Sequence, residues 1–269
     1  MSLRVGRIAA LNMFPIYFGL EARGGGLRFS DGVPTALNEA LLAGRLDVSA
    51  VSSVAYARNA DRLSLVPVAS ITAAGAADSI QLFSRVPLTR VETIAVTPDS
   101  ATSVVLLRLL LGADRPPFRV LQGSPRAALR EVDAVLLIGD EALSALQARI
   151  APYNVDLAEF WYDQTGLPMV FAVWAARLEV ARSSAAALDA LADLIRDAQR
   201  AFQERPDAVV AAAAERFPFS PEFIRRYFGR LSYEFTEVER AGLAHFLERA
   251  GEAGLLRAPA VPQGVGSVR

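Results

Sequence analysis

Polar residues that could bind a small molecule follow several of the apolar runs of this chain. Asn12 follows the first run, Ser52 and Ser53 follow another, and Asp140 follows a third. Where a helix begins after such a run, its first N–H groups have no partner within the helix and are suited to an anion. The candidate binding residues at these junctions are Ser52, Ser53, Ser100, Thr102, Ser103, Gly139 and Asp140. Asn12, and Ser79 at the start of a predicted crossing strand, complete the set of candidates.

These residue types can bind a carboxylate through hydroxyls, an amide and backbone N–H groups. Ser100 and Asp140 could equally have a structural role, because both are suitable N-cap residues for the helices that follow. His245, the only histidine, lies on the predicted apolar face of a C-terminal helix, where we expect it to pack. The glycines at positions 24–26 lack the following helix of a dinucleotide fingerprint and predict a flexible turn.

The residue types that are absent exclude whole classes of chemistry. The 28 basic residues are all arginine, and the chain has no cysteine. A cysteine nucleophile, a disulfide, a Cys-ligated zinc site, a lysine Schiff base and a phosphate-binding loop that needs lysine are therefore excluded. With one histidine and scattered carboxylates, we expect no metal site and no cofactor. The formal charge of −1 gives no basic excess, so we expect no general binding to nucleic acid.

Short apolar runs alternate with segments of helical periodicity, which predicts an α/β fold with mostly parallel strands. Strands are expected at 4–11, 46–51, 63–68, 79–84, 93–97, 118–121, 133–138 and 167–175, with a short one around Phe29. Helices are expected at 12–20, 34–44, 54–60, 101–111, 125–130, 141–150, 183–203, 206–215, 221–229 and 236–249, and 156–162 is expected to be helical or irregular. Ser220 is a predicted N-cap, and Thr236 with Glu239 has the spacing of a capping box.

The order of these elements predicts two α/β lobes joined by two crossing strands. We expect residues 1–87 and 173–258 to form the first lobe, covered by the C-terminal helices, and residues 88–172 to form the second. The Pro/Gly-rich residues 259–269 predict a disordered tail. The topology resembles the type II periplasmic-binding-protein fold, in which the junctions of both lobes face one cleft. No run reaches the length of a membrane span and none is typical of a signal peptide, so we expect a cytoplasmic protein with no membrane partner. The oligomeric state is left open.

Six segments, taken in order, resemble the chorismate dehydratase family of the futalosine route to menaquinone. The resemblance covers about residues 4–177 in motif detail and continues only as a helix pattern beyond them. The segments are RVGRIAALNMFPIYFGL, VPTALNEALLAGRLDVSAVSSVAYA, SIQLFSRVPL, DSATSVVLLRLLL, DAVLLIGDEAL and TGLPMVFAVWAAR.

The resemblance implies a binding-protein fold that has become an enzyme. Its reaction removes water from chorismate, a dicarboxylate, and gives 3-[(1-carboxyvinyl)oxy]benzoate, without a cofactor. It further implies that Asn12 and Ser79 are the catalytic residues and that the enolpyruvyl carboxylate of the substrate is the base. Met13 departs from the small residue common at this position in the family, which affects the expected shape of the pocket.

Two other functions remain as alternatives. The sister enzyme of the same pathway, 1,4-dihydroxy-6-naphthoate synthase, shares the fold but uses a histidine in the cleft, whereas His245 is expected on a C-terminal helix. A solute-binding protein for an organic anion would need no catalytic group. Such a protein normally carries a signal peptide or a lipid-attached cysteine, and this chain has no cysteine.

Overall fold

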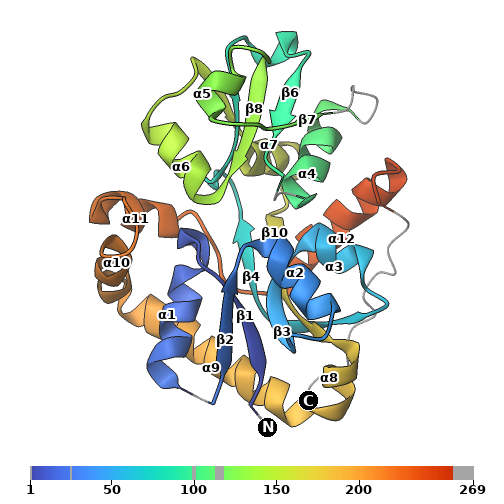
Figure 1. The fold of residues 1–269 in the computed structure, drawn as a ribbon, viewed down its shortest axis with the longest axis vertical. Coiled ribbons are helices and arrows are strands. Elements are labelled where there is room, and N and C mark those ends of the chain that lie inside the picture. The colour runs from blue at the N-terminus through green and yellow to red at the C-terminus, as the bar shows by residue number, and fades with distance from the viewer. Residues whose placement is uncertain (1, 25, 99–100, 113–117, 257–269) are drawn as a thin grey trace.

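The computed structural model describes residues 2–24, 26–98, 101–112 and 118–256. Two five-stranded sheets lie one above the other in Figure 1, each flanked by helices. The predicted tail at 259–269 and Ser100 lie outside the described residues. Within the described residues, no helix is long and apolar enough to cross a bilayer.

The first sheet holds the N-terminal strands and the long strand by which the chain returns. Its order is β2 (Arg28–Gly32), β1 (Arg4–Ile8), β3 (Val48–Ser52), β10 (Met169–Arg177) and β4 (Leu63–Ala73). β1 is parallel to β2 and β3, whereas β10 is antiparallel to β3 and β4.

The second sheet repeats this mixed arrangement. Its order is β7 (Arg119–Val120), β6 (Ile94–Val96), β8 (Ala134–Ile138), β5 (Ile80–Ser84) and β9 (Tyr153–Asp156). β6 is parallel to β7 and β8, and β5 is antiparallel to β8 and β9. The expectation of mostly parallel strands is confirmed: in each sheet four of the five strands run in the same direction, and only β10 and β5 are antiparallel to their neighbours. β5 and β10 arrive from the other sheet and enter from the opposite end, so they run against their neighbours.

The helices begin close to where the sequence predicts them, except α8, which was not predicted. They are α1 (Phe14–Arg23), α2 (Pro34–Leu42), α3 (Ser53–Arg58), α4 (Ala101–Leu111), α5 (Pro125–Ala128), α6 (Gly139–Gln147), α7 (Leu157–Thr165), α8 (Leu178–Ser183), α9 (Ala185–Glu204), α10 (Pro206–Ala214), α11 (Pro221–Phe228) and α12 (Glu237–Glu252). The Ser220 hydroxyl accepts the Phe223 N–H at 3.2 Å, and the capping box of Thr236 and Glu239 is present. The caps predicted at Ser220 and Thr236 are confirmed, because a cap depends only on residues within one turn. The alternative that Asp140 is an N-cap is wrong, because α6 begins at Gly139 with Ile138 as its N-cap and Asp140 lies in the first turn.

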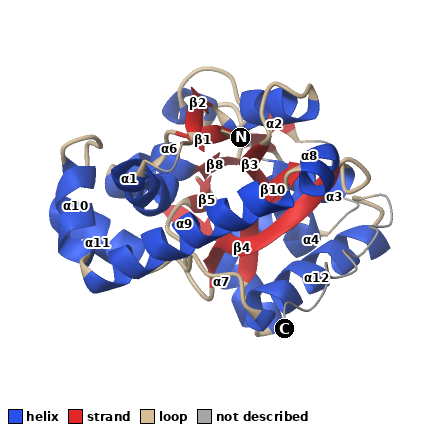
Figure 2. Ribbon diagram, turned by 90° about the horizontal axis from the view of Figure 1, so that it is seen from below, coloured by secondary structure: helices blue, strands red, loops and turns tan. Residues whose placement is uncertain are grey.

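The C-terminal helices α9 and α12 pack against strands of the first sheet, with close backbone approaches to neighbouring segments. α9 lies against α1 and β4 (Figure 2), and a Cβ on Gly19 would come within 2.4 Å of the Ala198 Cβ. α12 contacts β10 and α4, and a Cβ on Gly242 would lie 2.3 Å from the Pro168 carbonyl oxygen. At these two sites only glycine allows the observed packing.

The chain passes between the sheets twice, which places polar residues in the space between them. The first passage follows β4 and ends at β5, and the second runs from α7 to β10. β5 belongs to the second sheet although it precedes residue 87. The division into lobes at residues 87 and 172 stays a prediction.

Candidate functional site

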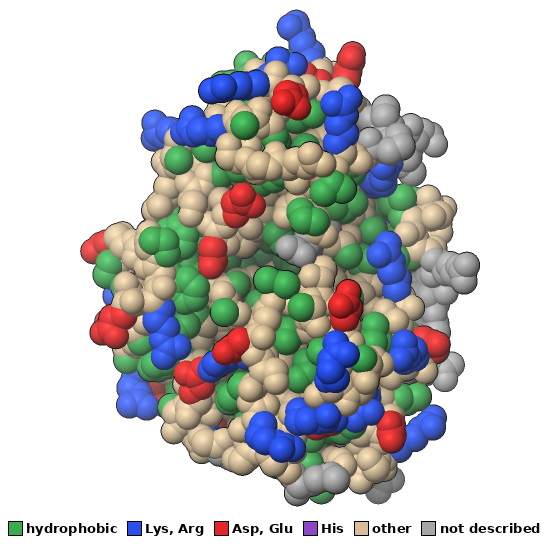
Figure 3. Space-filling view, in the orientation of Figure 1, with side chains coloured by type: hydrophobic (Ala, Val, Ile, Leu, Met, Phe, Trp, Pro, Cys, Tyr) green, Lys and Arg blue, Asp and Glu red, His purple; other side chains and the backbone are tan. Residues whose placement is uncertain are grey.

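A cavity of about 300 Å³ lies between the two sheets, where β1, β3 and β8 end. The surface is hollowed between the upper and lower halves of the molecule, and hydrophobic side chains gather there (Figure 3). The cavity brings together six of the nine predicted site residues. They are Asn12, Ser52, Ser79, Thr102, Ser103 and Gly139. The remaining described lining residues are Ile8, Ala10, Met13, Pro34, Ile71, Ile80, Thr97, Ala101, Ile138, Glu141, Phe171 and Ala172.

Asn12 lies in a short 3-10 turn, residues Leu11–Met13, between β1 and α1. Its side-chain oxygen Oδ1 is buried and has no hydrogen-bond partner within the described part of the chain. A buried acceptor left unpaired costs about 1–3 kcal/mol. A ligand that donates a hydrogen bond would remove this cost, so the geometry of Asn12 favours a binding role.

Ser79 immediately precedes β5 and is 1% exposed. Its carbonyl oxygen accepts the N–H of Gly139, the first residue of α6, at 2.8 Å. This bond ties the start of β5 to the start of α6, and both residues line the cavity. The fully buried Tyr227 hydroxyl lies close to the Ser79 side chain and makes no hydrogen bond with good geometry within the described residues. Burial, opposed by Ser79, raises the pKa of Tyr227.

Two hydroxyls at the cavity wall cap the same short helix. The Ser52 hydroxyl accepts the Ala55 N–H at 3.2 Å, which caps α3. The Thr102 hydroxyl, from α4 on the other side of the cavity, accepts the Val54 N–H at 3.1 Å. Because β3 leads into α3 and β6 precedes α4, the Thr102 bond joins the two halves of the molecule. Ser103, the next residue of α4, is buried and lines the same wall.

The electrostatics of the cavity are set by one carboxyl and by helix ends. Among the described lining residues, Glu141 is the only one with an ionisable side chain. Burial raises the pKa of Glu141. The N-cap of α6, Ile138, offers no side-chain acceptor, so the first N–H groups of this helix lack a side-chain cap. These N–H groups and the partial positive charge of the helix end are suited to an anion.

Three predicted binding residues are not among the described cavity residues. Ser53 is 0% exposed, and its hydroxyl donates to the Val170 carbonyl of β10 at 2.6 Å. Asp140 lies beside the cavity and accepts the Leu11 N–H at 3.1 Å, a second bond between the two halves. Burial raises the pKa of Asp140, and the hydrogen bond from Leu11 opposes that rise. Ser100 falls outside the described residues.

Twelve of the described lining residues were not among the predicted site residues, and three of them show which signals were missed. Thr97 ends a predicted strand, so the same junction rule that selected Ser52 also applies to it. Glu141 directly follows Asp140, but successive residues of a helix point in different directions, so Glu141 lines the cavity and Asp140 does not. Phe171 comes from β10, whose place beside β3 depends on pairing across about 120 residues. No local signal in the sequence identifies it.

His245 lies on α12, and its ring centre is 5.6 Å from that of Trp161. His245 is not among the residues that line the cavity, which agrees with the predicted packing role. In the described ranges, no group of three or more His, Cys, Asp or Glu side chains is placed to bind a metal ion.

The structure is similar to that of protein AF1704 from Archaeoglobus fulgidus, with a TM-score of 0.78, 19% identity and coverage of 95% of this chain and 98% of that one. It is also similar to the CA3427 gene product of Candida albicans, which has the generic periplasmic binding protein fold. That comparison has a TM-score of 0.69, 11% identity and coverage of 96% and 91%. The predicted periplasmic-binding-protein-like fold is confirmed.

Two sequence relatives are named as enzymes. The chorismate dehydratase of Thermus thermophilus is 35% identical over 258 residues, which cover 89% of this chain and 92% of the relative. The 1,4-dihydroxy-6-naphtoate synthase of Streptomyces coelicolor is 28% identical over 229 residues, covering 80% and 79%. A family model described as menaquinone biosynthesis matches residues 3–252. The chain therefore belongs to the menaquinone biosynthesis family.

Proposed function

We propose that this protein is a chorismate dehydratase, a carbon–oxygen lyase. The observation that carries the proposal is the 35% identity to the chorismate dehydratase of Thermus thermophilus over nearly the whole of both chains. The cavity supports it, because it combines apolar walls with an amide, several hydroxyls and a helix N-terminus. Such a lining suits a small, partly apolar anion such as chorismate. We further propose that the enzyme acts in the cytoplasm.

The reaction removes the hydroxyl from ring carbon C4 and the proton from C3, and the ring becomes aromatic. Aromatisation supplies driving force, so the protein has mainly to orient the substrate and stabilise developing charge. The proposed base is the enolpyruvyl carboxylate of the substrate itself. Glu141, with its raised pKa, is the only ionisable side chain among the described lining residues, which limits the protein's own choice of base.

Two residues have proposed catalytic roles. The Asn12 amide orients the substrate, with its unpaired Oδ1 accepting a hydrogen bond from the ligand and its NH₂ group donating one. The Ser79 hydroxyl donates a hydrogen bond to the departing C4 hydroxyl or to the carboxylate that takes the proton. Both roles need atoms at the cavity wall, which is where Asn12 and Ser79 lie.

The proposed binding of the carboxylates uses other residues of the cavity lining. Ser103, Thr102 and the first turn of α6 present hydroxyls and N–H groups without a basic side chain. Ser52 adds a hydroxyl from the end of β3. Ser100 stays in the proposal as a binding residue on the basis of its sequence position alone.

The sister enzyme is the second candidate, because of the 28% identity to the 1,4-dihydroxy-6-naphtoate synthase of Streptomyces coelicolor. That enzyme is expected to need a histidine in the cleft. The only histidine of this chain, His245, packs on Trp161 and is not a cavity residue. This observation favours the dehydratase.

The test is to incubate the purified protein with chorismate and to follow the product by mass spectrometry. We expect a product lighter than chorismate by one water. Ser183→Ala is a suitable control, because Ser183 is exposed on α8, its hydroxyl pairs with that of Ser184, and it does not line the cavity. Binding of chorismate without conversion would favour a solute-binding role, and no binding at all would overturn the proposed substrate.

A further inference from the structure

An unusual turn directly precedes Ser79. Asp78 has a φ of +60°, one of only two positive values at non-glycine positions within the described ranges. The Ser79 N–H donates to the Ala77 carbonyl at 2.7 Å, which closes a three-residue turn around Asp78. A γ-turn of this hand is rare and strained for a residue with a Cβ, so other contacts must stabilise it.

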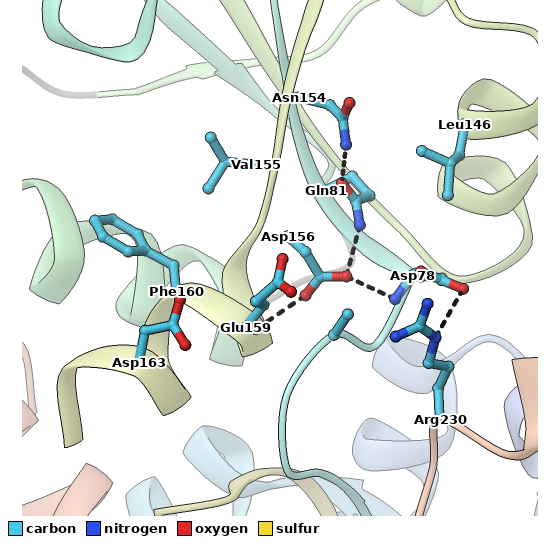
Figure 4. Close-up of a pocket in the computed structure, with 11 residues that line it drawn as sticks. Asp78, Gln81, Leu146, Asn154, Val155, Asp156, Glu159, Phe160, Asp163 and Arg230 are labelled. Carbon is cyan, nitrogen blue, oxygen red and sulfur yellow. Dashed lines mark hydrogen bonds and ion pairs between the residues drawn. The ribbon is translucent and has the colours of Figure 1, made fainter. Parts of the chain in front are cut away.

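The Asp156 carboxylate supplies those contacts (Figure 4). Its Oδ2 accepts the Ala77 N–H at 3.0 Å and the Asp78 N–H at 2.6 Å. The same oxygen accepts from the Gln81 side chain at 2.6 Å. The other oxygen, Oδ1, accepts two N–H groups at the start of α7, at 3.0 and 3.2 Å. One buried carboxylate thus accepts two backbone N–H groups of the turn and also caps α7.

Arg230 holds the turn from the C-terminal part of the chain. Its Nε lies 3.6 Å from the Asp78 carboxylate (Figure 4). The Asp78 side chain is 13% exposed, and that of Arg230 is 44% exposed. The segment that follows α11 therefore contributes one further contact to the turn before Ser79.

These contacts determine the direction of the Ser79 side chain. Only one peptide bond separates the φ of Asp78 from the Cα of Ser79. If the turn relaxed to a negative φ, the plane of that peptide would rotate and the Ser79 Cβ would move relative to the cavity wall. On the C-terminal side of Ser79, the hydrogen bond from the Gly139 N–H fixes the Ser79 carbonyl. On the N-terminal side, the turn fixes the backbone, so the turn determines how the Ser79 side chain is oriented.

We propose that Asp156 is a positioning residue for the reaction, because it fixes the turn that directs the Ser79 hydroxyl into the cavity. The inference rests on the proposed function, in which Ser79 is catalytic. Asp156 does not line the catalytic cavity and acts only through the turn.

The test uses Asp156→Asn, because asparagine caps helices as well as aspartate does. The remaining oxygen can still accept the N–H groups of α7, while the new NH₂ group faces the donors of the turn and repels them. We expect kcat to fall about tenfold to hundredfold, as for other small misplacements of a reacting group. KM is expected to change by less than about threefold, because the binding wall is untouched.

Asp133→Asn is the matched control. Asp133 also accepts backbone N–H groups, those of Glu92 at 3.2 Å and Thr93 at 3.0 Å, and pairs with Arg85. It precedes β8 at the end away from the cavity. We expect its kcat and KM to equal those of the unaltered protein. If Asp156→Asn does not fold, Asp156→Ser takes its place, since serine is also an N-cap residue and offers nothing to the turn.

Crystal structures of Asp156→Asn and of the unaltered protein, together with the kinetics, test the role of Asp156 separately from the proposed function. A displaced Ser79 hydroxyl together with a reduced kcat is the expected result. An unchanged kcat in an active enzyme would overturn the role of Asp156 and leave the proposed function standing. If the unaltered protein does not convert chorismate, the proposed function fails. The role of Asp156 in placing Ser79 is then judged by the crystal structures alone, where an unmoved Ser79 hydroxyl refutes it.

Discussion

At the scale of single residues, the cavity contains a polar atom that the protein itself leaves unpaired. The Asn12 Oδ1 has no partner among the described residues, and Asn12 lines the cavity. An unpaired buried acceptor lowers stability in the absence of a ligand. Such an atom at the cavity wall is what a binding site that is completed by its substrate requires.

Asn12→Ala tests this trade between stability and activity. We expect kcat/KM for chorismate to fall about hundredfold, because the orienting amide is lost. The melting temperature is expected to stay equal or to rise, because the substitution removes a buried unpaired oxygen. Turnover assays and thermal unfolding of the same preparation check both. A variant that lost stability but kept full turnover would contradict the assignment.

Thr102→Val tests another part of the cavity lining. The substitution keeps the shape of the side chain but removes the acceptor for the Val54 N–H and one hydroxyl facing the ligand. We expect KM to rise about tenfold, the equivalent of one lost hydrogen bond, with a smaller change in kcat. Thr102→Ser retains the hydroxyl and is expected to restore KM. Equal KM values for Thr102→Val and the unaltered protein would exclude contact with the substrate.

The sequence predicts site residues where the signal is local. Asn12, Ser52 and Gly139 each follow a buried strand, and the junction alone places them at the cavity. Ser53 satisfies the same rule, yet its hydroxyl is used by Val170 of a strand that is remote in sequence. Tyr227 was not predicted, because only the tertiary packing of α11 brings it close to Ser79.

At the scale of elements, local signals again predict what the structure contains. α4 occupies the predicted residues 101–111, and α12 begins at its capping box. β9 was not predicted, because it is a short edge strand with the exposed Tyr153 and lacks an apolar run. The direction of β5 and β10 could not be predicted either, since it follows from which sheet each strand comes from.

The turn between β4 and β5 makes a prediction at this scale. Asp78→Ala and Asp78→Gly both remove the contact with Arg230, but only glycine adopts a φ of +60° without strain. We therefore expect Asp78→Ala to be less stable than Asp78→Gly by about 1 kcal/mol. Denaturant unfolding of the two variants measures the difference. Equal stability would show that the turn is not strained by a side chain.

At the scale of the whole molecule, the cavity exists because both sheets contribute to its walls. The hydrogen bonds from the Val54 N–H to the Thr102 hydroxyl and from the Leu11 N–H to the Asp140 carboxylate join the two halves. The order of the predicted elements was sufficient to predict a two-lobed fold with a cleft. The contacts that join the halves were not predictable, because they depend on how the lobes meet.

The charge of the cavity predicts how substrate binding depends on pH. Burial raises the pKa of Glu141, and a bound dianion would raise it further because like charges repel. Asp140, whose pKa burial also raises, lies beside it. The protonated form binds the anion better, so KM is expected to fall as the pH is lowered through the pKa of Glu141. Glu141→Gln is expected to flatten this dependence and to lower KM at weakly alkaline pH. A KM that rises on acidification would contradict this account.

The central claim is that the cavity between the two sheets dehydrates chorismate with the help of Ser79. The most direct measurement follows chorismate by proton NMR in the presence of the unaltered protein and, in parallel, of Ser79→Ala. We predict that the ring signals of chorismate are replaced by those of a disubstituted benzoate, and that Ser79→Ala slows this change at least about hundredfold. Unchanged chorismate in both samples, or equal rates in the two, would contradict the account.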